Sequence, residues 1–434
     1  MLFNSKSRKK LLRSLRRDGG ARSKRKKNNI KKDGNGGADG IKDINDVISF
    51  FSSELDSDPK LVPTGVLKPL TKQLYQEFYN HFKSVEATMS IPPITSKPYS
   101  VSIKGLYDHI NPALRVIVDD QMKLTYECNV YITKDITIKI SIKNDPEEVN
   151  NIHKYFSMII LWLNIVTKYS SNSCSSTTLI IHIMLSDIKK LLPSNECTDN
   201  CYVKNTSVNT GYSMSCRHIV IYRKEEWFKV FIHETIHNFN LDFSPYPYEK
   251  EDQIKAIFGI TNTRLVVKLF EAYTESWARM IHAMLVAYDT TTTEDDYIDK
   301  THRNIQLEQI NAYFQTAKLM KYTGLDRTLD KTMTNFGDYT EDTANLSYYF
   351  IVSMLYNDLQ DYIAWCHSHN KNTLQFDNDH TSNQQEQFIS FIKTAKEKPD
   401  YYNRIKYYLD KYFKSTTYNY LYTFMRKSLL VRKK

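Results

Sequence analysis

Residues 230–239 read Val230-Phe231-Ile232-His233-Glu234-Thr235-Ile236-His237-Asn238-Phe239 and contain the pattern His-Glu-x-x-His. On an α-helix, His233 and His237 lie one turn apart on the same face, so both imidazoles can reach one tetrahedral zinc ion at about 2.0–2.1 Å. Glu234 lies beside that face, where its carboxylate can accept the proton of a metal-held water. The segment carries no other charged residue, which is typical of a half-buried active-site helix. The alternative is a core helix with two hydrogen-bonded histidines, which would bury two imidazoles and a carboxylate at high cost.

The motif and its uncharged surroundings resemble the zincin metallopeptidases, whose catalytic helix carries this pattern. Residues 219–222 (Ile-Val-Ile-Tyr) read as a strand running into the helix, and zincins place a sheet edge beside the active site, where substrate backbone adds as an extra strand. The resemblance covers about residues 176–290, and the chain is also similar to uncharacterised zincin-like proteins predicted in large DNA viruses. It implies a Zn²⁺ cofactor, a protein or peptide substrate and a zincin-like fold.

The third zinc ligand decides the subfamily. Metzincins continue the motif with a glycine and a third histidine, but this chain has Asn240 and Phe243 at those positions, which excludes that class. Asp242, next to the missing histidine, remains a candidate because aspartate can bind zinc. Its alternative role is to end the helix or to cap the turn at residues 244–247.

The segment Leu269-Phe270-Glu271-Ala272-Tyr273-Thr274-Glu275-Ser276-Trp277-Ala278 resembles the gluzincin helix that supplies a glutamate as third ligand. Glu271 matches the ligand position, 34 residues after His237. Glu275 follows one turn later, where gluzincins have a carboxylate that orients a zinc-bound histidine. Phe270 stands in place of the usual asparagine, so the choice between Glu271 and Glu275 stays open.

A second interpretation of this helix, expected over residues 262–288, is that its polar face is solvated. One apolar stripe is formed by Val266, Phe270, Tyr273, Trp277, Ile281 and Met284. The opposite face carries both glutamates and several basic residues, and it allows a Glu275–Arg279 ion pair at i,i+4. Alternatively, this face lines the active-site cleft, which the upstream motif favours. A donor for the oxyanion is still needed, and the sequence offers Tyr348, Tyr349 and His282 without placing them.

The order of predicted elements indicates an α+β fold. Residues 123–132 and 136–142 alternate apolar and polar and predict a hairpin, and Asp145-Pro146 predicts a helix start that continues to about residue 168. Residues 179–185 are apolar enough for a central strand. Helices are expected at about 262–288, 296–322, 342–366, 384–396, 399–413 and 416–428. Strands with helices come first and helices alone follow, which predicts a mixed sheet with the active-site helix in an upper lobe and an all-helical lower lobe.

We therefore predict four parts. Residues 1–44 form a disordered basic arm with a Gly-rich tether, and residues 45–120 form a helical and extended segment. Residues 121–248 form the sheet-bearing catalytic lobe, and residues 249–434 form the helical lobe with the third zinc ligand. A length of 434 residues suits one bilobed catalytic unit with extensions.

The positive charge is concentrated at the N-terminus. The chain has a net charge of +10, yet residues 1–32 hold 14 Lys/Arg against Asp18, so the remainder carries about −3. Residues 23–27 (Ser-Lys-Arg-Lys-Lys) resemble a nuclear-import or nucleic-acid-binding segment, and Met1-Leu2-Phe3 with the following leucines resembles a mitochondrial presequence. A solubilising tail without an address is the third interpretation. Aromatic residues are scarce, so nucleic-acid contacts would be to phosphates.

No secretory signal is visible, because no continuous apolar core follows the basic start. The most apolar run, residues 156–166, is too short to span a bilayer and reads as a buried helix. Six cysteines, unevenly spaced, suit reduced thiols. We expect an intracellular protein, cytoplasmic or nuclear, with virion association as an option and mitochondrial import less favoured. Cys197, Cys201 and Cys216 with His218 are candidates for a second metal site.

The leading hypothesis is a gluzincin-like zinc metallopeptidase in which His233, His237 and Glu271 bind the metal and Glu234 is the general base. The alternative is a non-enzymatic, nucleic-acid-associated or virion-packaged protein on a zincin-like scaffold, with residues 1–32 as the nucleic-acid contact. The substrate and the oligomeric state are not encoded in these patterns.

Overall fold

The computed structural model describes residues 41–63, 66–100, 106–170, 177–192, 201–246, 250–327, 333, 335–377, 381–413 and 420–432. The predicted arm lies outside this range, apart from its last four residues. Ile41 is already buried, and Asp43 caps helix α2 (Ile44–Ser57) by accepting hydrogen bonds from the backbone N–H groups of Asn45 and Asp46. Structured chain therefore begins no later than Ile41.

Within the described residues, one open six-stranded sheet has the order β1-β2-β3-β4-β6-β5. The strands are β1 (Thr95–Pro98), β2 (Leu124–Tyr131), β3 (Asp135–Ile142), β4 (Leu179–Met184), β5 (Gly211–Met214) and β6 (His218–Ile221). The central pairs β3–β4 and β4–β6 are parallel. The pairs β1–β2, β2–β3 and β5–β6 are antiparallel. The predicted hairpin is the β2–β3 pair, and the predicted mixed sheet and α+β class are confirmed.

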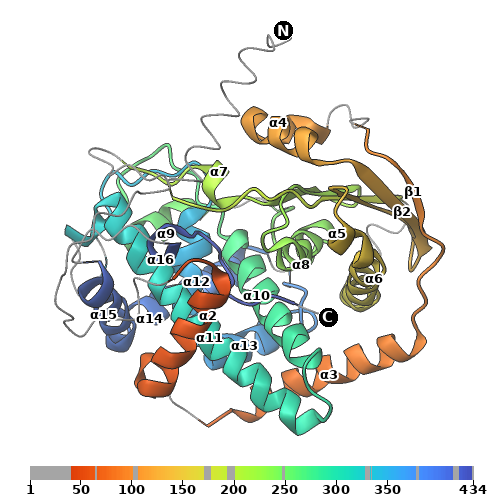
Figure 1. Cartoon of the computed structure of the whole chain (residues 1–434). Coiled ribbons are helices and arrows are strands. Elements are labelled where there is room, and N and C mark those ends of the chain that lie inside the picture. The colour runs from red at the N-terminus through yellow and green to blue at the C-terminus, as the bar shows by residue number, and fades with distance from the viewer. Residues whose placement is uncertain are drawn as a thin grey trace, which may run out of the picture.

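The two faces of the sheet are covered differently. Ile136, Ile138, Ile140 and Ile142 alternate along β3 and are all buried on the inner face. On the outer face, helix α4 (Pro112–Gln121) packs a small apolar cluster over β4 and β6. That cluster contains Ile110, Leu114, Val118, Met122, Met184, Val220 and Tyr222. Figure 1 shows α4 above the sheet and α5, α6 and α8 below it.

The other helices lie beneath this layer (Figure 1). The three helices directly below the sheet are α5 (Pro146–Asn150), α6 (Ile152–Tyr169) and α8 (Trp227–Asn238). The remaining ones are α3 (Pro69–Thr88), α9 (Glu251–Phe258), α10 (Phe270–Tyr288), α11 (Glu294–Thr323), η5 (Leu346–Ile351), α12 (Val352–Asn357), α13 (Leu359–His369), α14 (Thr381–Lys396) and α15 (Pro399–Tyr412). Short turns are η1 (Pro59–Leu61), η2 (Leu106–His109), α7 (Asn205–Val208), η4 (Leu325–Arg327) and α16 (Tyr420–Thr423). Every strand of the sheet precedes α8, so the predicted order of elements is confirmed.

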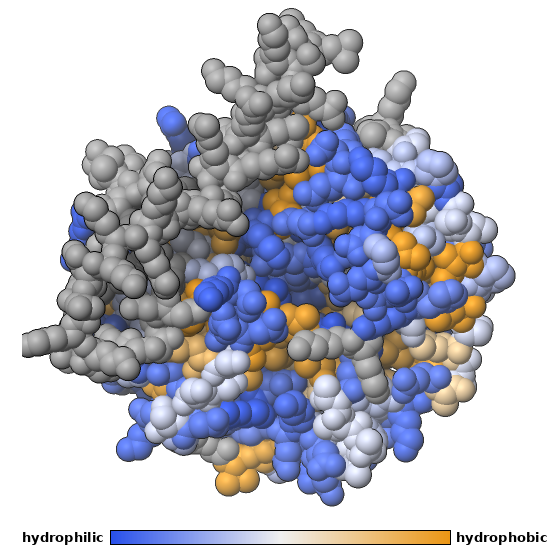
Figure 2. Space-filling model, viewed as in Figure 1, coloured by the Kyte–Doolittle hydropathy of each residue, from blue (hydrophilic) through white to orange (hydrophobic). Residues whose placement is uncertain are grey.

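The predicted segment 45–120 is shared between the two layers. Its strand β1 and helix α4 belong to the sheet, whereas α2 and α3 pack against α11. None of the described helices is long and apolar enough to span a membrane. The face seen in Figure 2 is mainly hydrophilic, with hydrophobic residues in small groups.

Four predicted helices need correction. The helix expected over 342–366 starts with the π-helical turn η5, and Asp358 divides the rest into α12 and α13. The helix from Pro146 is broken at Asn151, which separates α5 from α6. The helix expected over 262–288 begins only at Phe270, because the residues before it bury every second side chain, as an extended segment does. Of the helix expected over 416–428, the described residues form only the single turn α16, and the residues after it are not helical.

The C-terminal segment after α16 is buried from residue 424 to residue 430. The backbone N–H of Met425 donates to Lys190 O at 2.8 Å, and the N–H of Ser428 donates to Glu226 Oε1 at 2.7 Å. Glu308 Oε1 accepts hydrogen bonds from Ser428 Oγ and from two further backbone N–H groups. Side chains thus satisfy backbone groups that a helix would have paired internally.

Candidate metal centre

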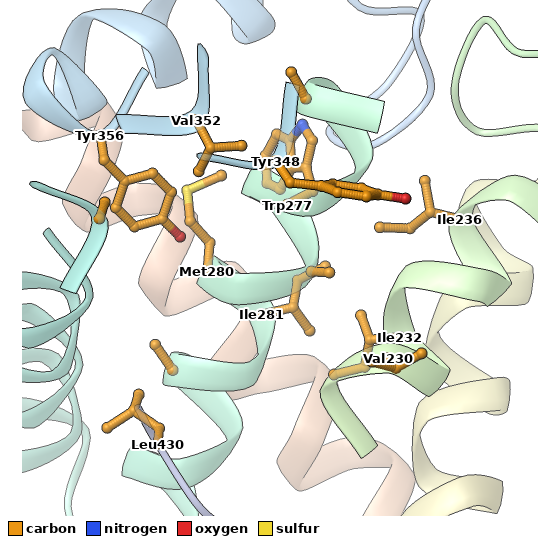
Figure 3. Close-up of a cluster of buried hydrophobic side chains, with 14 of the residues drawn as sticks. Val230, Ile232, Ile236, Trp277, Met280, Ile281, Tyr348, Val352, Tyr356 and Leu430 are labelled. Atoms are coloured by element: carbon orange, nitrogen blue, oxygen red, sulfur yellow. The ribbon is translucent and has the colours of Figure 1, made fainter. Parts of the chain in front are cut away.

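Helix α8 carries the His-Glu-x-x-His motif and is buried along nearly its whole length; of its residues, only His237 is partly exposed. Its N-terminal neighbour Glu226 has a φ of 59° and is held by Lys190 Nζ at 2.7 Å. From α6, Trp162 Nε1 donates to Thr235 Oγ1 at 2.7 Å. Figure 3 shows the apolar side chains of α8 on the side towards α10, with Ile236 facing Tyr348 of η5. Contacts with α6 and α10 therefore hold α8 in place, and this sets the direction in which His233 and His237 point.

Three side-chain atoms from α8 and α10 face one another in this centre. His233 Nε2 lies 3.1 Å from His237 Nε2, and Glu271 Oε2 lies 3.1 Å from His233 Nε2 and 3.2 Å from His237 Nε2. In a regular tetrahedral site with bonds of about 2.0–2.1 Å, ligand atoms are about 3.3–3.4 Å apart. The three atoms are thus spaced within about 0.3 Å of the ligand atoms of a tetrahedral metal site. His233, His237 and Glu271 form a cluster that could hold a metal ion.

A carboxylate lies behind each histidine. Asp242 Oδ2 is 2.5 Å from His237 Nδ1 and also accepts a hydrogen bond from Thr274 Oγ1 at 3.0 Å. Glu275 Oε2 is 3.0 Å from His233 Nδ1, close enough for an ion pair although not aligned as a hydrogen bond. Carboxylates at this position orient metal-binding histidines and raise their basicity. Among the three alternatives for the third ligand, Glu271 faces the Nε2 atoms, and Asp242 and Glu275 face the Nδ1 atoms.

The charges of this cluster are strongly coupled. Burial lowers the pKa of His237, but the carboxylates of Asp242 and Glu271 outweigh this effect and hold that pKa well above its usual value. Burial raises the pKa of Glu271, but the two histidines outweigh it and hold that pKa well below its usual range. The ion-free cluster therefore favours a protonated imidazole beside an ionised carboxylate, so a metal ion would have to displace a proton on binding.

The interpretation of α10 as a solvated helix is wrong. Glu275 and Arg279 are 0 % and 2 % exposed. They do not pair with each other in this structure: Lys229 Nζ binds Glu275 at 2.7 and 3.0 Å, and Arg279 binds Glu308. Burial raises the pKa of Glu275, but Lys229 and other nearby cations outweigh it and hold the pKa well below its usual range. Glu275 is thus an ionised, buried carboxylate fixed between Lys229 and His233.

Glu234, next to His233 on α8, is not part of the three-residue cluster. It is 6 % exposed, and within the described residues its carboxylate has no hydrogen bond and no ion pair. Its charge is close enough to raise the pKa of Tyr348, although burial and Glu271 contribute more to that shift. A buried carboxylate without a protein partner is available to a water molecule or a substrate.

Of the three candidate oxyanion donors, Tyr348 lies at the cluster. Its ring centroid is 6.0 Å from that of His233, and Lys427 Nζ lies 3.0 Å from its ring centroid. Figure 3 shows Tyr348 extending past α10 towards α8. Tyr349 instead donates its hydroxyl to Met425 O, and His282 is buried near Ser428. Tyr348 lies on the π-helical turn η5, a geometry frequent at functional sites and invisible in the sequence.

Strand β5 is the edge of the sheet nearest α8. Asn238 Nδ2 at the end of α8 donates to Met214 O at 2.8 Å. A Cβ atom at Gly211 would lie 2.7 Å from Val220 O, so only glycine allows β5 to approach β6 this closely. The segment Gly211–Met214 is therefore an edge strand.

The cysteine predictions fare differently. Cys201 and Cys216 are disulfide-bonded, whereas Cys128 and Cys366 are buried free thiols. Cys197 lies outside the described residues. A disulfide leaves no thiolate for a metal, so the expectation of reduced thiols and the second metal site are both contradicted at Cys201 and Cys216.

Comparison of the chain with protein-family models, curated proteins and solved structures gives no match.

Proposed function

We propose that this protein is a zinc-dependent peptidase of gluzincin type. His233, His237 and Glu271 would hold Zn²⁺, and Glu234 would act as general base. The observation that carries this proposal is the convergence of two Nε2 atoms and one carboxylate oxygen to 3.1–3.2 Å from each other. Two imidazoles and one carboxylate are the protein ligands of many catalytic zinc sites, which keep the fourth position for water.

The residues around the cluster fit that metal. Both Nδ1 atoms face carboxylates, which leaves the Nε2 atoms free to bind the ion. A bound zinc ion would lower the pKa of its water and polarise the scissile carbonyl. The protein's share is to orient the ligands and to bury them, as side-chain exposures of 5 % for His233 and 13 % for His237 and Glu271 indicate.

Two further residues have roles in this proposal. Glu234 accepts the proton of the attacking water and passes it to the leaving amine, for which its carboxylate must be ionised and without a protein partner. Tyr348 donates its hydroxyl hydrogen to the oxyanion that develops on the carbonyl oxygen. The pKa of Tyr348 is well above its usual value, mainly because of burial and then because of nearby carboxylates, so the hydroxyl keeps its proton at neutral pH.

Strand β5 supports a peptide as substrate. It is an edge strand beside α8, and an extended chain can add to such an edge through backbone hydrogen bonds. Backbone pairing is tolerant of sequence, so it would hold a peptide in register without deciding which residues flank the cleaved bond.

The non-enzymatic alternative depends on residues 1–32, which lie outside the described residues. No described observation favours it over the peptidase.

The test combines metal analysis with hydrolysis of a peptide library. The purified wild type should carry about one zinc per chain and cleave peptides. Glu234→Gln should keep the metal and lose about 10²–10⁴ of the rate, and Tyr348→Phe should keep the metal and lose about 10²–10³. Tyr349→Phe is the matched control, since its hydroxyl bonds Met425 O away from the cluster. Absence of metal from the wild type in chelator-free buffer would exclude the proposal.

A further inference from the structure

Two segments, residues 261–269 and 336–344, run from a common point towards the candidate metal centre. At that point Ile260 and Gly337 form a parallel β-bridge. Beyond it the two segments separate, and a cavity of about 930 Å³ opens with residues of both segments in its lining. The cavity is large enough for several residues of an extended peptide.

The segments meet again where the candidate site begins. Ser347 Oγ donates a hydrogen bond to Lys268 O at 2.8 Å, which closes the far end. Lys268 lines the cavity three residues before Glu271, and Ala344 lines it four residues before Tyr348. The cavity therefore adjoins the helices that carry these two site residues.

The first segment presents alternate side chains to solvent. Arg264, Val266 and Lys268 are exposed, whereas Leu265, Val267 and Leu269 are buried. Val266 is 58 % exposed, although single exposed valines are common on proteins. The period of two means that one face carries a cation, an apolar group and a second cation.

The backbone of this segment is open at Val266, between the hydrogen bonds made by the N–H of Arg264 and the C=O of Lys268. The N–H and C=O groups of Val266 have no hydrogen bond to any residue that the structure describes. An extended stretch with unpaired backbone groups is a place where another extended chain can pair.

The two cations have no salt bridge within the described part of the chain. Burial raises the pKa of the Glu341 carboxyl to about 7, and the nearby charge of Lys268 lowers that pKa only slightly. Glu341 already accepts hydrogen bonds from Tyr339 Oη at 3.0 Å and from the N–H of Leu346 at 2.7 Å. On the facing segment, Asp342 accepts a hydrogen bond from the N–H of Asn205. Asp338, an exposed residue of the facing segment, also lines the cavity. The two cations are therefore the charges on the exposed face of residues 264–268 itself, where a paired peptide would lie.

We propose that this cavity binds an extended peptide segment in which two acidic residues flank an apolar one in the pattern acidic-x-apolar-x-acidic. The apolar side chain lies over Val266, and the acidic side chains pair with Arg264 and Lys268, since side chains on one face of an extended chain repeat about every 7 Å. The view that this peptide is part of a substrate rests on the proposed function. The binding of the peptide to the cavity does not depend on that function.

The experiment measures fluorescence anisotropy of labelled peptides on the full-length Glu234→Gln variant, which should not hydrolyse them. The first probe is Ala-Glu-Ala-Leu-Ala-Glu-Ala, and the second has the same composition with its two glutamates adjacent. Any general attraction by the basic residues 1–32 acts on both probes equally. The patterned peptide should bind about five- to tenfold more tightly, as two partly exposed ion pairs allow.

Charge reversal provides the second arm. Adding Arg264→Glu and Lys268→Glu should abolish the preference for the acidic pattern and create one for the peptide with lysines in place of glutamates. Adding Lys72→Glu and Lys393→Glu changes the net charge equally at exposed sites on other helices and should leave the preference intact. Arg264→Ala with Lys268→Ala is the milder variant if the reversal impairs folding, and it should also abolish the preference.

Each outcome separates this inference from the proposed function. Equal binding of the two acidic peptides, or a charge-reversed variant that behaves like its control, would overturn the inference even if the wild type binds zinc and cleaves peptides. Patterned binding in a protein that holds no zinc would support the cavity as a peptide site and reject the peptidase.

Discussion

Replacing Asp242 by asparagine tests whether this residue orients a metal ligand or is a ligand itself. Asp242 is 0 % exposed, and its Oδ2 lies 2.5 Å from His237 Nδ1, on the side of the ring away from Glu271. Asparagine keeps an acceptor oxygen and removes the charge. Loss of such an orienting carboxylate weakens metal binding about 10- to 100-fold, or about 1.4–2.7 kcal/mol. Glu271→Ala removes an atom of the cluster itself and should abolish stoichiometric binding, since two histidines cannot close the site.

The assay is a competition titration of zinc against a chromogenic chelator at fixed pH, with wild type, Asp242→Asn and Glu271→Ala in parallel. Circular dichroism of the metal-free proteins shows whether each variant is folded. If Asp242→Asn loses as much affinity as Glu271→Ala, Asp242 is a ligand and the gluzincin pattern is wrong. If its affinity equals that of the wild type, the contact to His237 has no influence on the metal.

Three further predictions concern other parts of the molecule. Burial raises the pKa of Glu226, but its lysine partners outweigh this and bring it to about 2, so its stabilisation is present above pH 4.5 and is lost as the pH falls from 4.5 towards 2. Urea unfolding at pH 7 and pH 3 should show this loss: the free energy of unfolding should fall by about 2 kcal/mol more in the wild type than in Glu226→Gln, which should itself be about 3–5 kcal/mol less stable at pH 7. Gly211→Ala should lower the thermal midpoint and reduce peptide cleavage, because its Cβ would press on Val220 O; unchanged values would show that β5 can shift freely. Deleting residues 1–40 should leave zinc content and peptide cleavage intact but abolish salt-sensitive DNA binding in a filter assay, since +13 charges lie in residues 1–32; undiminished binding would place the contact elsewhere.

Local patterns made the sheet-bearing part predictable. The alternating isoleucines of β3 and the short link before them lead directly to the hairpin, and the His-Glu-x-x-His segment leads to α8. Such elements are specified by residues close in the chain, so sequence periodicity is sufficient. The break at Asn151 has no counterpart in the pattern, because Asn151 itself keeps helical backbone angles and the segments on both sides of it are helical.

The region before α10 shows how one pattern can fit two structures. Val266 falls on the same helical stripe as Phe270, yet Leu265, Val267 and Leu269 also repeat every second residue. Burial in the folded protein follows the second pattern, and Val266 is exposed. Contacts with the rest of the fold decide which of the two patterns is buried, and these contacts cannot be read from the spacing of apolar residues.

The candidate site was predictable in its residues but not in its arrangement. The spacing of Glu271 from the motif could be matched to a known pattern, whereas the positions of Asp242 and Glu275 behind the histidines depend on how α8 meets α10. Tyr348 comes from more than 100 residues further along the chain, on a turn with no sequence signature. Contacts of that separation are a property of the fold.

The burial of the C-terminal segment has a consequence for how the protein is made. The carboxylate of Glu226, at the start of α8, is satisfied in part by the N–H of Ser428, 202 residues further on. At a synthesis rate of about 5–20 residues per second, the motif of α8 leaves the ribosome roughly 10–40 s before that partner exists. During this interval the helix lacks one of the contacts that fix its start. A newly made chain therefore passes through a period in which the His-Glu-x-x-His motif is complete in sequence while this contact at the start of its helix is still missing.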